Sequence, residues 1–174
     1  MGGNQKISLR ELNALGRYDF VHLIGPVFEH SPWIAESAWA QRPFANWDDL
    51  LLALHATVGG AGEEKQLSLI RDHPDLAGRA AVTGSLTRES AKEQAGSGLD
   101  RLSPEEIMLF TRLNAAYREK FGFPFVICAR LNKKEAMLAG FESRLKNTRE
   151  TEVKTALEEI FKIAELRLRD RCGL

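Results

Sequence analysis

The sequence has little of what would place it in several common functional classes. Lys and Arg number 24, and Asp and Glu also number 24, so the formal net charge is zero. A nucleic-acid binder needs a concentrated positive field to displace counterions, and balanced, interspersed charges do not supply one. The longest apolar stretch, residues 123–129, has seven residues, whereas a transmembrane helix needs about 20. We therefore expect neither a nucleic-acid partner nor a membrane partner.

Cysteine is also scarce. The two cysteines, Cys128 and Cys172, lie 44 residues apart and form no CxxC or other metal-binding spacing. One disulfide could join them, but a reduced protein is the better interpretation, which favours a cytoplasmic location. Residues 1–6 contain no apolar core of a signal peptide. We expect residues 1–7 to form a flexible tail.

Several motifs of common enzyme classes are missing. The chain contains no GxGxxG, GxxxxGK[ST], GxSxG or HExxH. Its four histidines, which share no helix face at i, i+4, are His22, His30, His55 and His73. The sequence therefore gives little local support to a nucleotide site, a hydrolase elbow or a metal site.

Helix signals are abundant by contrast. Ala and Leu number 43 against 14 for Val and Ile, and unbranched side chains lose little rotamer freedom in a helix. The expected helices begin at or near eight positions: Ser8, Ser31, Asn46, Glu63, Thr87, Ser103, Asn132 and Thr148. Gly16 is expected to close the first of them. We predict one all-α domain over residues 1–174, with about eight helices and one extended apolar segment.

His73 has an unusual backbone setting. It precedes Pro74, which biases His73 toward an extended conformation and ends the preceding helix. A histidine held on a short, rigid turn could act as a general acid or base near neutral pH. The alternative is an ordinary surface turn residue.

A second candidate is the helix expected after Thr87. Ser90, Glu93 and Gln94 are spaced i, i+3 and i+4, which places them on one helix face. This face could be the polar wall of a pocket, with one carboxylate and two hydrogen-bonding neighbours. The alternative is a solvated polar surface.

A third candidate lies in the last expected helix. Val153, Ala156, Ile160, Ile163 and Arg167 follow +3, +4, +3 and +4 spacing, which puts Arg167 on the apolar stripe. A guanidinium there is costly unless it is paired or faces a polar cavity. The alternative is a side chain whose head reaches solvent near the helix end.

The fourth candidate is the segment Phe123-Pro124-Phe125-Val126-Ile127. It is too apolar for a surface loop, and Pro124 favours a non-helical conformation. Non-helical backbone inside a helical protein leaves N–H and C=O groups that need partners, and a polar ligand could supply them. A connector through the core is the alternative.

These features, in this order, resemble the 2-oxo-4-hydroxy-4-carboxy-5-ureidoimidazoline (OHCU) decarboxylases. The stretches that match are HPDLAG at residues 73–78, SAKEQ at 90–94, GLD at 98–100, LNAAY at 113–117, KFGFPF at 120–125, Arg144-Leu145 and IAELRL at 163–168. One departure is Ser97, where the family usually has alanine. The resemblance covers roughly residues 8–170.

The resemblance implies an all-helical fold and a decarboxylation of OHCU to (S)-allantoin in urate degradation that uses no cofactor or metal. It implies that His73 is the catalytic acid and Arg167 the substrate-binding arginine. It also implies that the substrate contacts Pro74, Ser90, Glu93, Gln94, Phe123, Pro124, Phe125, Val126 and Ile127. Because many members are dimers, a homodimer is expected.

Glu93 is the third residue for which we expect a catalytic role, beside His73 and Arg167. We expect it to accept hydrogen bonds from the ureido or hydroxyl groups of the substrate, because a carboxylate is a poor partner for the departing carboxylate. Two other functions compete with the decarboxylase. One is a helical metal protein using His73, Glu93 and other carboxylates, and the other is a non-catalytic helical adaptor.

Overall fold

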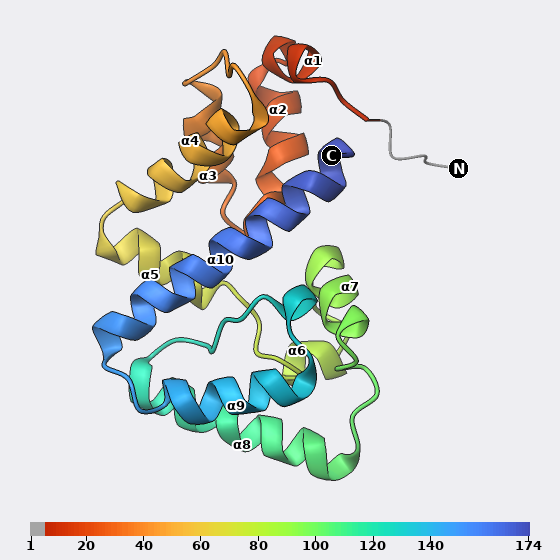
Figure 1. The fold of residues 1–174 in the computed structure, drawn as a ribbon, viewed down its shortest axis with the longest axis vertical. Coiled ribbons are helices and arrows are strands. Elements are labelled where there is room, and N and C mark those ends of the chain that lie inside the picture. The colour runs from red at the N-terminus through yellow and green to blue at the C-terminus, as the bar shows by residue number, and fades with distance from the viewer. Residues whose placement is uncertain (1–5) are drawn as a thin grey trace. The chain divides into compact units, whose positions relative to one another are not determined.

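The computed structural model describes residues 6–174, so most of the predicted flexible tail, residues 1–5, lies outside the described part. Ten α-helices and two short 3₁₀ helices make up the regular structure, and residues 6–174 contain no strand. This confirms the all-α prediction (Figure 1). None of these helices combines the length and apolar character needed to span a membrane.

The chain divides into two compact units. The first comprises residues up to Leu69 together with Phe161–Leu174, and the second comprises Ile70–Ile160. The predicted single domain over residues 1–174 stays a prediction.

The first unit contains α1 (Leu9–Ala14), α2 (Arg17–Ile24), η1 (Gly25–Val27), α3 (Pro32–Trp39), α4 (Trp47–Gly59), most of α5 (Glu63–Arg71) and the C-terminal part of α10 (Arg149–Cys172). Helix α3 packs against both α2 and α4. The core of this unit consists of fully buried apolar side chains, among them Leu12, Phe20, Ile24, Ile34, Leu50 and Leu54. Burial of this apolar surface is the main stabilising contribution to the unit.

The second unit contains α6 (Arg79–Val82), α7 (Arg88–Gly96), α8 (Pro104–Phe121), η2 (Ala129–Leu131), α9 (Lys134–Arg144) and the first part of α10. Helices α8 and α9 pack against each other and run side by side in Figure 1. The ring of Tyr117 contacts four other rings in the core, those of Phe121, Phe123, Phe125 and Phe141. These aromatic contacts fix the segment that follows α8 against the two helices.

Side-chain caps explain why most helix starts were predictable. Ser103 and Glu106 form the expected capping box at α8, and Thr87 accepts a hydrogen bond from the Ser90 N–H at α7. Asn132 was expected to start α9, but Lys133 precedes that helix and the Asn132 side chain instead donates to the Cys128 carbonyl at 2.9 Å.

Helix α2 was not expected from the sequence, and α6 was expected only as a short helix that Asp75 could cap. Both begin after a glycine that has no capping side chain, Gly16 before α2 and Gly78 before α6. Gly16 was expected to close α1, but Leu15 occupies that end and Gly16 is the extended residue from which α2 starts. An N-cap side chain is the local sequence signal of a helix start, and these two short helices begin without one.

Candidate active site

His73 lies just beyond the end of α5, as its position before Pro74 predicts. Helix α5 ends at Arg71, and the His73 N–H donates to the Ile70 carbonyl at 3.2 Å. The residue is 5% exposed, so the alternative of a surface turn residue is wrong. A buried imidazole in a fixed turn suits proton transfer, because its surroundings can tune its protonation and hold its orientation.

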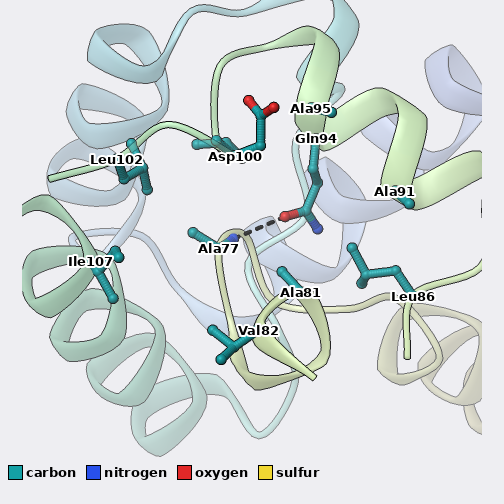
Figure 2. Close-up of a pocket in the computed structure, with 11 residues that line it drawn as sticks. Ala77, Ala81, Val82, Leu86, Ala91, Gln94, Ala95, Asp100, Leu102 and Ile107 are labelled. Carbon is teal, nitrogen blue, oxygen red and sulfur yellow. Dashed lines mark hydrogen bonds between the residues drawn. The ribbon is translucent and has the colours of Figure 1, made fainter. Parts of the chain in front are cut away.

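The turn that follows His73 is held by Gln94 of α7. The Gln94 Oε1 atom accepts from the Ala77 N–H at 2.9 Å (Figure 2). Its Nε2 atom donates to the Asp75 carbonyl at 3.2 Å. Ala77 has φ of 49°, a left-handed conformation that is unusual for a residue with a side chain. The amide of Gln94 therefore stabilises a strained turn, a role that the sequence did not indicate.

Helix α8 supports the same turn from its own surface. The Asn114 Nδ2 atom donates to the Leu76 carbonyl at 2.9 Å, and Arg118 Nε contacts both carboxylate oxygens of Asp75 at 2.9 and 3.2 Å. Residues 73–78 are thus fixed by side chains from two helices. The roles of Asn114 and Arg118 were not predicted from the sequence, although Asn114 lies in LNAAY, one of the stretches that carry the resemblance.

The polar face of α7 is largely covered. Ser90 is 4% exposed and Gln94 6% exposed, and Glu93 is half-buried. For Ser90 and Gln94 the alternative of a solvated surface is therefore wrong. Buried polar side chains of this kind need hydrogen-bond partners, and for Gln94 the turn at Asp75 and Ala77 supplies them.

A pocket of about 330 Å³ opens beside α7 (Figure 2). Of the predicted site residues only Gln94 lines it, beside Ala91 and Ala95 of the same helix. The rest of its wall is mostly apolar, contributed by Ala77, Ala81, Val82, Leu86, Leu99, Asp100, Leu102 and Ile107. The pocket is therefore not the polar site predicted from the sequence.

The apolar segment after α8 is irregular and buried, as predicted. Phe123 is 0%, Phe125 1% and Val126 3% exposed, while Pro124 is buried and Ile127 half-buried. Its polar groups are partly bound: the Val126 carbonyl accepts from Arg144 Nη1 at 2.7 Å. Across residues 6–174 the backbone N–H and C=O groups of Phe125 and Ile127 have no hydrogen-bond partner. Backbone groups without protein partners in a mostly buried segment are available to a polar ligand.

Arg167 is buried in the first unit and does not reach solvent. It is 3% exposed, and its Nη1 atom lies 2.8 Å from Oε2 of Glu29, which is also 3% exposed. The alternative of a solvent-reaching head is therefore wrong. Glu29 was missed because nothing in its local spacing marks it. The only available signal was general: a buried guanidinium requires a carboxylate or another acceptor.

The predicted residues thus fall into two groups. The second unit contains His73, Pro74, the polar face of α7 and residues 123–127, whereas the first unit contains Arg167 with Glu29. In the described part of the chain, no group of three or more His, Cys, Asp or Glu side chains is placed to hold a metal ion.

Fold and site together define an all-α protein with a buried histidine turn, a buried polar helix face and a buried arginine. The family model described as OHCU decarboxylase matches residues 13–169. The chain belongs to the OHCU decarboxylase family, which confirms the resemblance seen in the sequence.

Individual relatives agree with this assignment. The 2-oxo-4-hydroxy-4-carboxy-5-ureidoimidazoline decarboxylase of Haloferax volcanii is 43% identical over 166 residues, covering 95% of this chain and 96% of that protein. The enzyme of the same name from Mus musculus is 40% identical over 163 residues, with 94% and 92% covered.

Two solved structures share the fold. The crystal structure of (S)-allantoin synthase has a TM-score of 0.76 and 27% identity, covering 95% of this chain and 54% of that chain. The crystal structure of OHCU decarboxylase in the presence of (S)-allantoin has a TM-score of 0.68 over 91% of this chain and 100% of that chain. At 20% identity, the second supports the fold alone.

Proposed function

We propose that this protein decarboxylates OHCU to (S)-allantoin in urate degradation and protonates one face of the product stereospecifically. The observation that carries the proposal is the family match over residues 13–169, which includes every proposed site residue. The buried His73 turn supports it independently, as do the backbone groups of Phe125 and Ile127 that have no hydrogen-bond partner within residues 6–174.

The proposed chemistry uses the substrate as its own electron sink. Loss of CO₂ leaves an electron pair on the ring carbon that carried the carboxylate, delocalised into the ring imine and carbonyl. The protein has to hold the carboxylate out of the ring plane before it leaves, stabilise the resulting anion and protonate one face. His73 assists this step and supplies or relays the proton that sets the stereocentre. Pro74 and Ser90 contact the substrate beside it.

Glu93 and Arg167 orient the substrate. Glu93 accepts hydrogen bonds from the ureido or hydroxyl groups, and the guanidinium of Arg167 binds the carboxylate or the developing oxyanion. Because Arg167 is paired with Glu29 at 2.8 Å, the pair is close to neutral, and recognition depends on directed hydrogen bonds more than on net charge. Backbone groups of residues 123–127 bind the ring carbonyl and N–H.

We also propose a cytoplasmic homodimer that needs neither metal nor cofactor. Both cysteines are free thiols, which fits a reducing compartment. Light scattering of the purified protein measures the oligomeric state.

Circular dichroism of the product tests the proposed function. Freshly generated OHCU decays spontaneously to racemic allantoin, so catalysis is measured as faster decay together with one enantiomer. The adaptor alternative predicts a racemic product at the spontaneous rate. The metal-protein alternative predicts activity that disappears after chelation and dialysis, whereas the proposed mechanism predicts activity that survives both.

A further inference from the structure

We propose that Arg144 is a positioning residue that sets the backbone of residues 125–127 for the substrate by binding the Val126 carbonyl. The inference rests on the proposed function, because the substrate is what that backbone would recognise.

A buried network holds the Arg144 guanidinium in place. Its Nε atom lies 2.8 Å from Oε2 of Glu152, while its Nη1 atom donates to Val126 at 2.7 Å. Glu152 is 0% exposed and accepts further hydrogen bonds from the Tyr117 hydroxyl and, at 2.7 Å, from Asn147 Nδ2. The two ends of the guanidinium are therefore bound to different elements, one to α10 and one to the segment.

The side chain of the neighbouring residue is also fixed by Arg144. The guanidinium carbon lies 4.4 Å from the centroid of the Phe125 ring, and that ring stacks on Phe141 at 3.9 Å. One arginine thus contacts both a carbonyl and an aromatic ring of the same short segment. A lysine could not make both contacts and the Glu152 pair together, because it lacks the planar fork.

The buried ion pair is weak evidence for stability in itself. Desolvation of two charges offsets much of their attraction, and apolar residues of similar volume often stabilise a core equally well. An apolar residue at position 144 could fill the same space but could not donate to the Val126 carbonyl. The distinctive effect of the guanidinium is therefore on the conformation of the segment.

That effect decides which backbone groups face a ligand. The Val126 carbonyl is bound by Arg144, and the Cys128 N–H donates to Oε2 of Glu159 at 2.8 Å, so the protein occupies these two groups of the segment. The groups of Phe125 and Ile127, which lack partners within residues 6–174, are the ones left for a ligand.

The test uses a double variant, Arg144→Met with Glu152→Gln, because the single arginine variant leaves the buried Glu152 charge unpaired, which strongly destabilises the fold. The double variant removes both charges and the donor to Val126. We expect KM to rise about ten-fold, as the loss of one well-aligned hydrogen bond would cause, with a smaller change in kcat. Arg144→Lys, which keeps one donor, should recover part of the loss.

Lys134→Met is the matched control. Lys134 pairs with Glu106 and so links α9 to α8, the helices that also carry Arg144 and Tyr117, and within residues 6–174 it has no hydrogen bond to the segment. The KM of the Lys134→Met variant should equal that of the wild type. Thermal unfolding of each variant separates a loss of stability from a change in KM.

Each outcome has one interpretation. A wild-type protein that fails to accelerate OHCU decay overturns the proposed function. An active wild type with a folded double variant of unchanged KM overturns the role of Arg144. If the double variant does not fold, the comparison of Arg144→Lys with Lys134→Met decides: equal KM values contradict the proposal and a raised KM in Arg144→Lys alone supports it.

Discussion

His73 is the residue on which the proton step of the proposed mechanism depends. Its substitution by alanine removes the only group assigned to proton transfer, and general acid catalysis contributes about 10²–10⁴-fold. We expect His73→Ala to lose turnover by that order while far-UV circular dichroism stays that of a folded helical protein. Allantoin should then form at the spontaneous rate and as a racemate. A variant with near-normal turnover would contradict the role of His73.

Glu29 should matter because it orients Arg167. Their contact of 2.8 Å is buried on both sides, and removing one partner of a buried ion pair costs about 3–5 kcal/mol. Glu29→Gln should therefore lower the free energy of unfolding and raise KM more than it lowers kcat. Urea unfolding and steady-state kinetics measure the two effects.

An exposed ion pair in the same unit provides the control for Glu29. Arg17 and Glu36 lie 3.1 Å apart with side chains 63% and 44% exposed, and such pairs contribute at most about 1 kcal/mol. Glu36→Gln should change neither stability nor KM appreciably. If Glu29→Gln and Glu36→Gln change the free energy of unfolding and KM equally, the burial of the Glu29–Arg167 pair does not contribute to either quantity.

At the scale of the elements, the turn between α5 and α6 depends on Gly78. A Cβ atom at this position would lie 2.6 Å from the Cβ of Asp75, so the turn would have to shift. We expect Gly78→Ala to destabilise the protein by about 1–3 kcal/mol, as overpacking does, and to lower kcat by displacing His73. Gly96→Ala is the control, since a Cβ there meets no atom within 4 Å. Identical melting temperatures of the Gly78→Ala and Gly96→Ala variants would contradict this prediction.

Elements with local chemical signals were predictable from the sequence. The capping box of Ser103 and Glu106 marked α8, and Pro124 marked the irregular segment. Helix α2 lacked such a signal because it starts after an uncapped glycine. The same distinction applies to the site: the spacing of Ser90, Glu93 and Gln94 placed them together on α7.

Partners distant in the chain could not be predicted. Glu29 and Arg167 are 138 positions apart, and no spacing rule links residues at that distance. Gln94 was expected to contact substrate, and only the tertiary structure reveals that both ends of its amide bind the turn at Asp75 and Ala77. Its contact with substrate stays a prediction.

At the scale of the whole molecule, His55 should make stability depend on pH. It stacks on Phe161 at 4.1 Å, and its Nε2 atom is buried without a partner in residues 6–174. Burial lowers the pKa of His55 below its ordinary value of 6.5, partly opposed by the charge of Glu165. The unfolded chain therefore binds the proton more readily, and the stabilising contribution present above pH 6.5 is lost as the pH falls through the lower, folded pKa.

His55→Phe should flatten this pH dependence, because phenylalanine keeps the ring contact and cannot be protonated. Urea unfolding between pH 7.5 and 5 measures it, with the exposed His22 replaced in a control variant. If the free energy of unfolding of His55→Phe changes with pH as steeply as that of the wild type, the pH dependence comes from other groups.

The two cysteines can test whether the two compact units unfold as one domain. Cys128 lies in the second unit and Cys172 in the first, and each is 1% exposed. Burial raises the pKa of Cys172 to about 11 and also raises that of Cys128, so neither thiol should react with iodoacetamide in the native protein. Labelling then requires local or global opening.

If residues 1–174 form one cooperative domain, mass spectrometry should find both cysteines labelled over the same range of urea concentration. Labelling of one cysteine at clearly lower urea would contradict the single domain and identify the less stable unit.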